Sequence, residues 1–349
     1  MKLTEFDRPN VWDALKQSEK PIVLYGMGNG ADKVLDAFEY YGITAAGVMA
    51  SDHFCRYQEY RGFTVMKQSD FERKYDDFLI VLCFGSSLPE VTEHIEKVAA
   101  HHTMLIPNVP VTGSVLMDDG FIGRYREEIE KAYRLLADER SQNVFCSALR
   151  FYYTGRIEYL KEMESDKDEA FRGILKLKDE RYLDLGAYRG DTVDEFLRYT
   201  DGYQSITAVE PNPKNFKKLT EHIANTARAT AVNAGIADTV GTMYISKKAG
   251  RMPTLDEKGG IETAVTTVDQ LGCSPTYIKV DIEGMESRML KGAQKTLKEL
   301  KPKLNLAAYH RTEDFFKLVL QLSDINPSYK IYLRKHPYIP CWDLNIYAV

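Results

Sequence analysis

The stretch at residues 184–192, DLGAYRGDT, combines two glycines with two acids at a spacing that suits ligand chemistry. It follows an apolar run that is typical of a buried strand, and it leads into a predicted helix. Gly186 and Gly190 allow backbone angles and close approaches that a side chain would block. In open α/β sheets, ligands bind at such turns, where a strand reaches its carboxyl end. The acids Asp184 and Asp191 favour a cationic ligand over a phosphate anion.

Two more acidic groups follow predicted strands. Glu210 ends one strand in the sequence Val209-Glu210-Pro211, and residues 278–284, IKVDIEG, end a later one. Because the carboxyl ends of parallel strands lie along one edge of a doubly wound sheet, these acids should lie near the glycine turn. A carboxylate at the tip of the second strand can accept hydrogen bonds from both hydroxyls of a ribose.

Three side chains near strand ends could take a proton from an acceptor hydroxyl: Asp281, Glu283 and His310. An imidazole titrates near neutral pH, although a histidine at a strand end can equally bind the backbone. Glu283 and Glu286 could instead cap a helix that begins near residue 284. Asp281 with His310 could alternatively hold a divalent cation. Two ligands do not define a metal site, and we assign none.

The elements that must position these residues alternate between strand and helix, which predicts a sheet with helices on both faces. The last two strands are joined by a short loop that contains proline, so we expect them to pair antiparallel. The predicted strands are at residues 182–187, 206–210, 229–236, 243–246, 276–282, 304–309, 330–335 and 344–349. The predicted helices are near residues 192–199, 213–224 and 285–300.

A smaller unit of the same kind comes first in the chain, with strands predicted at residues 22–25, 43–49, 78–84 and 103–106. Its turn, GMGNGA from Gly26, resembles the dinucleotide pattern G-x-G-x-x-A, with Asp52 in the place of the ribose-binding acid. That pattern is weak alone, and we favour a tight turn that packs a helix against a strand. Ser86 and Ser87 could line the same crevice, but a solvated loop fits them better.

The expected fold class is therefore α/β, with two parallel sheets of different size. We predict a Rossmann-like domain at residues 1–112, a helical connector at 113–175, and a larger doubly wound domain at 176–349 that ends in an antiparallel strand pair. The aromatic residues at 151–159 are expected to pack in a core. The basic residues at 334–336 are expected to lie at an exposed strand end.

Composition narrows the classes of function. The net charge of −5 argues against nucleic acid as the main partner, and no apolar run approaches the length of a spanning helix. The N-terminus lacks the apolar core of a signal peptide. Five scattered cysteines without a C-x-x-C pair indicate reduced thiols, so we expect a cytoplasmic protein without a zinc site. The oligomeric state stays open, and a homo-oligomer is one option.

Four motifs in order resemble the FkbM-type methyltransferases: DLGAYRGDT at 184–192, AVEPN at 208–212, IKVDIEG at 278–284 and LKGA at 290–293. The resemblance extends over about residues 145–349 and takes in Tyr309 and His310. It implies the class I fold and S-adenosylmethionine as the cofactor.

The same resemblance implies the site. The backbone at the glycines of the turn would run close to the methionine part of the cofactor, and Asp184 and Asp191 would orient its amino group. Glu210 would hold the ribose. The stretch at residues 233–238 would run beside the adenine. Tyr188 could stack on the cofactor. The implied cofactor-binding residues are Asp184, Gly186, Ala187, Tyr188, Gly190, Asp191, Thr192, Glu210, Pro211, Asn212, Gly235, Ile236 and Asp238. The implied catalytic residues are Asp281, His310 and Glu283.

The expected function is methyl transfer to a hydroxyl of a saccharide or of a saccharide-bearing metabolite. One alternative is a nucleotide-sugar or NAD-binding oxidoreductase that acts through the N-terminal unit, but no Tyr-x-x-x-Lys pair follows its glycine turn. Another alternative is a binding module whose methyltransferase fold is catalytically silent. The intact acids and glycines of the turn argue against it.

Overall fold

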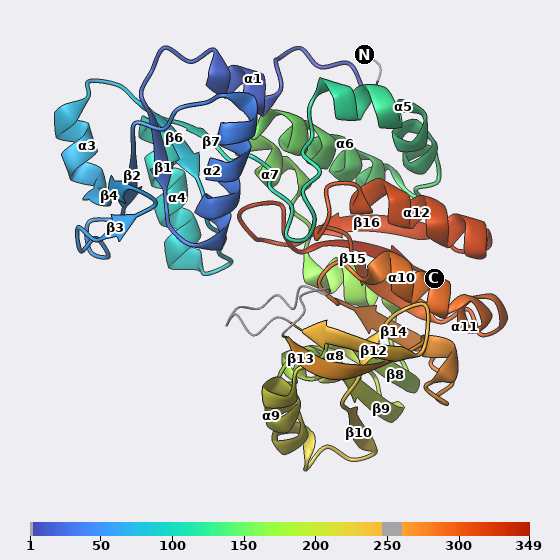
Figure 1. Ribbon diagram of the computed structural model, residues 1–349. Coiled ribbons are helices and arrows are strands. Elements are labelled where there is room, and N and C mark those ends of the chain that lie inside the picture. The colour runs from blue at the N-terminus through green and yellow to red at the C-terminus, as the bar shows by residue number, and fades with distance from the viewer. Residues whose placement is uncertain (1–2, 246–259) are drawn as a thin grey trace.

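The computed structural model describes residues 3–245 and 260–349, and it places two main sheets side by side with helices around them (Figure 1). The N-terminal sheet has five strands in the order β5-β2-β1-β6-β7, and its strands pair parallel. Its strands are β1 Ile22–Tyr25, β2 Gly47–Ala50, β5 Met66–Lys67, β6 Leu79–Leu82 and β7 Thr103–Leu105.

Helices cover both faces of this sheet because its strands are apolar on both sides. Along each strand, every second side chain packs against helices α1 and α2 on one face. The side chains between them pack against α3 and α4 on the other face. The helices are α1 Val11–Lys16, α2 Asn29–Tyr41, α3 Gln68–Lys74 and α4 Pro89–His101, and a small hairpin is formed by β3 Glu59–Tyr60 and β4 Phe63–Thr64.

The C-terminal sheet has seven strands in the order β10-β9-β8-β14-β15-β17-β16. Its strands pair parallel except for β17, which runs antiparallel to both β15 and β16, as the sequence predicted. The strands are β8 Glu180–Leu185, β9 Tyr203–Val209, β10 Ala229–Val232, β14 Tyr277–Val280, β15 Lys303–Ala307, β16 Ile331–Lys335 and β17 Leu344–Ala348.

The two faces of this sheet have different helical layers. One face carries the aromatic residues Tyr182 and Tyr277, which stack with Phe196 of α8. On the same face the ring of Tyr347 contacts Phe171 of a π-helical turn, η1. The other face packs against α10, α11 and α12. The helices are η1 Glu169–Leu175, α8 Asp191–Tyr199, α9 Pro213–Ile223, α10 Glu286–Gly292, α11 Gln294–Glu299 and α12 Asp314–Ile325, with a short 3-10 turn, η2, at Val268–Gln270.

Three helices that lie between the two sheets in the sequence pack against elements of the C-terminal half, such as α12. They are α5 Asp119–Arg134, α6 Glu139–Thr154 and α7 Glu158–Met163. The ring of Phe145 lies 5.0 Å from that of Phe315, and Tyr125 lies 5.6 Å from Phe316. Phe151, the first of the predicted packing aromatics, is fully buried. The prediction that this aromatic stretch packs in a core is therefore confirmed, whereas the domain boundaries stay predictions.

Several element boundaries differ from those predicted. The strand expected at 229–236 is divided, because β10 pairs with β9 whereas Gly235 and Ile236 form β11 in a separate small sheet, β11-β13-β12. Its strands are β11 Gly235–Ile236, β12 Gly241–Ile245 and β13 Ile261–Thr266, and Ser246 of the predicted strand lies outside the described residues. The helix expected at 285–300 is interrupted at Ala293, whose φ of −116° is not helical.

The prediction of an exposed basic strand end at residues 334–336 is wrong, since all three side chains are buried. Arg334 lies 2.7 Å from both Glu169 Oε2 and Asp138 Oδ2, and His336 Nε2 lies 2.7 Å from the Tyr347 hydroxyl. These acids belong to η1 and to the start of α6, which cover the end of β16. Burial is tolerated because each charge has a partner.

No helix among residues 3–245 and 260–349 is both long enough and apolar enough to cross a membrane.

Candidate active site

A cavity of about 590 Å³ lies beside the carboxyl ends of β14 and β15 in the C-terminal sheet. Residues from both the N-terminal and the C-terminal half of the chain line it. One wall carries Asp191 and Thr192 of the predicted glycine turn. A second wall carries the predicted catalytic residues Asp281, Glu283 and His310. The structure thus brings together residues that are about 90 to 120 positions apart in the sequence.

The loop between β16 and β17 forms the opposite wall. Tyr338 and Trp342 line it, with ring centroids 5.4 Å apart. Its backbone pairs with the N-terminal half: Ser86 N–H donates to Ile339 O at 2.7 Å, and Ile339 N–H donates to Ser86 O at 2.9 Å. Ser87 lines the cavity itself. The segment predicted as a solvated loop therefore contacts the C-terminal half.

The glycine turn sits tightly against the end of β14. Gly186 has a φ of +85°, and its N–H, like that of Ala187, donates to Val209 O at 3.0 Å. A Cβ atom at Gly186 would lie 1.9 Å from the carbonyl oxygen of Asp281. Gly190 has a φ of +102°, and a Cβ there would lie 2.5 Å from the His222 ring. Glycine is needed at both positions because protein atoms fill the space of a side chain.

Two buried carboxyl groups lie behind this turn. Asp184 accepts a hydrogen bond from the Thr192 hydroxyl, and burial raises the pKa of Asp184 to about 6. Glu210 accepts from Tyr188 N–H at 3.0 Å and from Asn212 N–H at 2.9 Å. Burial raises the pKa of Glu210 to about 7 even though these N–H groups lower it. Glu210 therefore ties the glycine turn to the tip of β9.

The other predicted cofactor residues continue along this edge. Tyr188 has a φ of +47°, and its ring lies 4.7 Å from the Arg189 guanidinium. The Asn212 side chain accepts the first N–H groups of α9 and so caps that helix. A Cβ at Gly235 would lie 4.0 Å from Pro211, so β11 adjoins the β9 tip.

Ile236, the second residue of β11, is buried. Asp238 pairs with Arg288, whose Nε donates to Asp238 Oδ1 at 2.8 Å.

The predicted catalytic residues form one cluster around the imidazole of His310. His310 Nε2 lies 3.3 Å from Asp281 Oδ1 and 3.5 Å from Glu283 Oε2. His310 Nδ1 lies 2.9 Å from Glu286 Oε1, and that oxygen accepts N–H groups of Ile282 and Gly284 at 3.1 and 3.3 Å. Glu286 therefore holds the loop before α10, whereas the predicted alternative had Glu283 and Glu286 capping the helix itself.

The cluster shifts the pKa values of its members in different directions. Burial alone would lower the pKa of His310. The nearby carboxylates of Glu286 and Asp281 raise it by more than burial lowers it, so the pKa of His310 lies well above its ordinary value. Burial opposes ionisation of Asp281, yet Lys279 and His310 hold its pKa well below the usual range. Burial raises the pKa of Glu283 to about 7. Of these three groups, Glu283 is the one whose pKa lies near neutrality.

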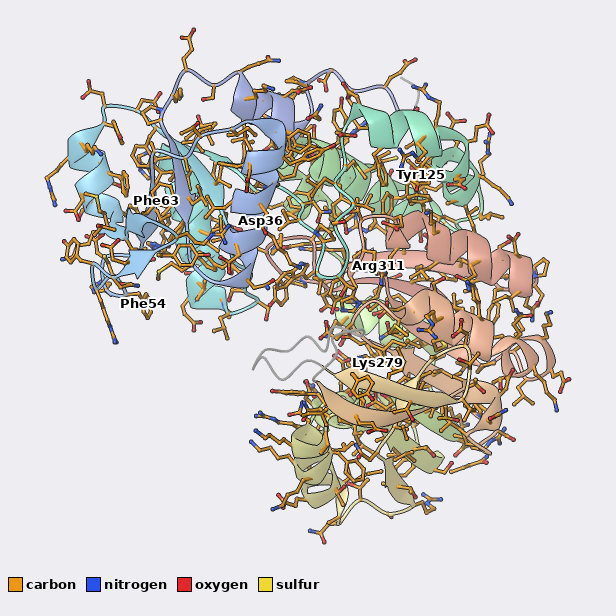
Figure 2. All side chains as sticks on the ribbon, viewed as in Figure 1. Asp36, Phe54, Phe63, Tyr125, Lys279 and Arg311 are labelled. Atoms are coloured by element: carbon orange, nitrogen blue, oxygen red, sulfur yellow. The ribbon has the colours of Figure 1, made fainter. Side chains whose placement is uncertain are left out.

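Sequence reasoning missed two polar residues beside Asp281. Lys279 (labelled in Figure 2) is buried in the middle of β14, where the register pairs it with Asp184 and Asn305, and its Nζ lies 3.4 Å from Asp281 Oδ2. The Tyr309 hydroxyl lies 3.3 Å from Asp281 Oδ2. A lysine within an otherwise apolar strand was the available signal for the first of them.

Thr112 braces the loop that follows β14 and carries Glu283. Its hydroxyl donates to Glu283 O at 3.0 Å, and its N–H donates to His310 O at 2.9 Å. Glu283 and Gly284 both have positive φ angles, +55° and +92°. A Cβ at Gly284 would lie 2.9 Å from the Thr112 Cβ, so the brace and the loop fit closely.

The N-terminal glycine turn has contacts that match the packing interpretation. A Cβ at Gly30 would lie 2.1 Å from Cys83 O, so this glycine lets α2 approach β6. The Tyr60 hydroxyl lies within hydrogen-bond distance of two acceptors, 2.9 Å from Gly28 O and 2.8 Å from Asp32 Oδ1. Asp52 accepts the Ser69 N–H at 3.2 Å.

Comparison with family models finds one match, to the methyltransferase FkbM domain, over residues 184–335. That range contains the glycine turn, the β9 tip, the Asp281 loop and His310. None of the curated proteins compared with the chain matches it.

The chain is also similar to a crystal structure of methyltransferase FkbM from Methylobacillus flagellatus KT, with a TM-score of 0.74 and 22% identity. The match covers 97% of this chain and 92% of that one, and it shows a shared fold for the whole chain. Precorrin-6y C5,15-methyltransferase from Geobacter metallireducens GS-15 aligns with a TM-score of 0.34 and 16% identity, over 51% of this chain and 83% of that one. Fibrillarin from Aeropyrum pernix, solved with S-adenosyl-L-methionine, gives 0.33 and 15%, over 50% and 67%. These last two likenesses are too low to carry an argument.

Proposed function

Because residues 184–335 form a methyltransferase domain of the S-adenosylmethionine-dependent FkbM family, we propose that this protein methylates a hydroxyl group of a saccharide or of a saccharide-bearing metabolite. The observation that carries the proposal is the cavity, which places the Asp281, Glu283 and His310 cluster within one enclosure with the glycine turn. A cofactor held by that turn would present its methyl group to an acceptor in the cavity.

The cofactor would lie along the carboxyl edge of β8, β9 and β11. We assign its amino group to Asp184 and Asp191, its ribose to Glu210, and its adenine to the stretch after β10. The full set of cofactor contacts that we propose is Asp184, Gly186, Ala187, Tyr188, Gly190, Asp191, Thr192, Glu210, Pro211, Asn212, Gly235, Ile236 and Asp238. Support comes from their shared position at the ends of β8 and β9 and around β11, and from Asp191 and Thr192, which line the cavity.

Methyl transfer needs the acceptor oxygen, the methyl carbon and the sulfur in one line. We assign proton removal to Glu283, because its carboxylate borders the cavity and lies beside His310. In this assignment the acceptor hydroxyl would give its proton to Glu283 while its oxygen takes the methyl group that S-adenosylmethionine would supply, with S-adenosylhomocysteine as the leaving group. Asp281 and His310 hold the acceptor side of the cluster in place.

The saccharide assignment has support from the opposite wall. Tyr338 and Trp342 offer flat apolar ring faces, while Asp343 and Asn345 supply hydrogen-bonding groups next to them. Ligand sites commonly combine aromatic surface with a few polar groups that fix orientation. A polyhydroxylated ring matches that combination.

We place the reaction in the cytoplasm, because all five cysteines are described and none forms a disulfide. The net charge of −5 favours a small acceptor over nucleic acid. A homo-oligomer is compatible with this proposal and is not needed by it.

Calorimetric titration with S-adenosylhomocysteine tests the cofactor site. We expect wild type to bind and Glu210→Ala to bind at least about tenfold more weakly, because two ribose hydrogen bonds are lost. NAD serves as the control ligand. Binding of NAD in place of S-adenosylhomocysteine would overturn the proposal in favour of an oxidoreductase.

Transfer of labelled methyl groups from S-adenosylmethionine to a panel of monosaccharides and nucleotide-sugars tests the acceptor. We expect a base-stable methyl ether on the product. Glu283→Gln should lower turnover by about 10²–10⁴-fold and leave S-adenosylhomocysteine affinity unchanged. A methylated amine or a methyl ester would contradict hydroxyl methylation.

A further inference from the structure

We propose that Glu286 is a positioning residue of the reaction, which acts through His310 by holding the imidazole as a cation beside Glu283. His310 is then not the proton acceptor that the sequence made it a candidate for, because a doubly protonated ring has no lone pair to offer. The inference rests on the proposed function where it concerns turnover, but the charge of His310 does not depend on that function.

Both ring nitrogens of His310 face carboxylate oxygens. Nδ1 lies 2.9 Å from Glu286 Oε1, and Nε2 lies 3.3 Å from Asp281 Oδ1 and 3.5 Å from Glu283 Oε2. A neutral imidazole carries one N–H and one lone pair, so either tautomer would turn a lone pair toward one of these oxygens. The imidazolium presents an N–H on each side, and the geometry therefore favours the charged form.

The two carboxyl groups nearest the ring are ionised. Glu286 Oε1 accepts the N–H groups of Ile282 and Gly284 at 3.1 and 3.3 Å, and such bonds favour a carboxylate. Burial opposes ionisation of Asp281, but Lys279, whose Nζ lies 3.4 Å from Asp281 Oδ2, is the first of the charges that hold its pKa well below the usual range. Both acids can therefore only accept, and the N–H groups between them must come from the ring.

Glu286 acts on the ring from a closed position. The side chains of Glu286 and His310 are each 1% exposed, whereas those of Asp281 and Glu283 are 32% and 24% exposed and line the cavity. Charges attract more strongly where water does not screen them. Among the described residues none accepts a directed hydrogen bond from His310 Nδ1, so its contact with Glu286 is an ion pair and depends on the charge of both partners.

The other titratable groups around the ring do not supply this negative charge. Asp314 of α12 is buried, and burial together with the charge of Glu286 raises its pKa above the ordinary range, so the proton lies on Asp314 and the charge on Glu286. The Tyr309 ring lies 4.3 Å from the imidazole, and burial raises the pKa of its hydroxyl, which stays uncharged. Lys279 and Arg311 are cations and oppose a charge on the ring.

The imidazolium prepares Glu283 for its proposed role. Burial raises the pKa of Glu283 to about 7, and the charge of His310 is the first of the groups that lower it, whereas Asp281 and Glu286 raise it. A neutral ring would therefore leave Glu283 protonated at neutral pH, and a protonated carboxyl group takes no proton from an acceptor hydroxyl. Glu286 thus has two opposite effects on Glu283: its own charge raises the pKa, and its hold on the imidazolium lowers it.

The charge of His310 can be measured without any acceptor, by nitrogen NMR of the full-length protein labelled at its histidines, with His310→Gln to identify the resonance. We expect wild type to keep both ring protons up to about pH 8.5, and Glu286→Gln to release one of them at least about one pH unit earlier than wild type. Glutamine keeps an oxygen for the two backbone N–H groups but lacks the charge. Glu299→Gln, exposed on α11, removes the same charge elsewhere and should leave the resonance unchanged.

A wild-type ring that loses its proton near the ordinary value of 6.5 would overturn the inference, and this result needs no variant. Release of the proton at the same pH in Glu286→Gln as in wild type would overturn the role of Glu286. Thermal melting shows whether the variant is folded.

Methyl transfer measured against pH adds a readout that a merely structural role would not move. We expect the acid limb of turnover, which reports Glu283, to move to higher pH in Glu286→Gln because the imidazolium is lost. A move to lower pH would show that Glu286 acts on Glu283 only as a nearby charge, and would overturn the inference. If the ring is charged but no hydroxyl is methylated, the proposed function fails and the imidazolium assignment stands. If hydroxyls are methylated and the ring is neutral, this inference fails alone.

Discussion

Glu210 is nearly closed to solvent, with Tyr188 N–H and Asn212 N–H as its donors. Burial raises its pKa in the folded protein to about 7, above the ordinary value of 4.5, and the nearby acid Asp184 adds to this effect. Between these values the folded state keeps a proton that the unfolded chain has lost. This carboxyl group therefore stabilises the fold fully below about pH 4.5, and the contribution is lost as the pH rises through 7.

We predict that Glu210→Gln removes this part of the pH dependence. Wild type should lose at most about 3 kcal/mol of unfolding free energy from Glu210 between pH 5 and pH 8, and the variant should not. Denaturant unfolding at both pH values measures the difference. Glu221→Gln, on the exposed side of α9, is the control. An unchanged pH dependence in Glu210→Gln would show that the carboxyl group does not keep its proton.

At the scale of elements, Gly186 fixes the distance between the β8 turn and the β14 end. We predict that Gly186→Ala destabilises the protein by more than about 3 kcal/mol and abolishes S-adenosylhomocysteine binding. The new Cβ would meet the Asp281 carbonyl at 1.9 Å, at a φ of +85° that alanine disfavours. Gly123→Ala in α5 is the control, because nothing lies within 4 Å of its Cβ. That control should stabilise the protein by about 0.5–1 kcal/mol. Thermal unfolding distinguishes the two, and equal melting temperatures would contradict the packing argument.

Arg334 joins three elements, since it is in β16 and pairs with acids of η1 and of the α6 cap. We predict that Arg334→Ala costs about 2–4 kcal/mol, because it empties the space of a side chain that is only 1% exposed and removes the hydrogen bonds to Asp138 and Glu169. Arg126→Ala on the exposed side of α5 should change stability by less than about 0.5 kcal/mol. Chemical denaturation measures both variants. A small effect at Arg334 would mean that water replaces the guanidinium at little cost.

Sequence patterns within about ten residues were enough to predict the turns and strand ends that such patterns define. The glycine turn and the acids of IKVDIEG were placed correctly at strand ends, because turn chemistry and apolar runs are readable within ten residues. Long-range contacts were not readable. Arg334 finds its acids 165 and 196 residues away, and so it was predicted to be exposed. The strand at 229–236 looked continuous, but its last two residues pair in another sheet, and residue pattern does not reveal pairing partners.

At the scale of the whole molecule, the N-terminal half helps to hold the acceptor cavity. We predict that Ser86→Pro weakens the acceptor site, because it removes the N–H that donates to Ile339 O at 2.7 Å. Ser86→Ala keeps that N–H and is the control. In the methyl transfer assay, the proline variant should show an acceptor KM raised by about tenfold, with S-adenosylhomocysteine affinity unchanged. Equal KM values in both variants would show that the bridge does not shape the cavity.

Thr112 is the last residue of the predicted first domain, yet its side chain and N–H hold the backbone of Glu283 and His310. The contact between the two halves therefore includes the loop of the predicted catalytic residue Glu283. This has a consequence for how such a protein can diversify. A recombination event that exchanges the N-terminal half would also exchange the brace, and the Gly284 loop would have to fit its new neighbour. The two halves are thus expected to be inherited together, with changes at position 112 matched by changes at positions 283–284.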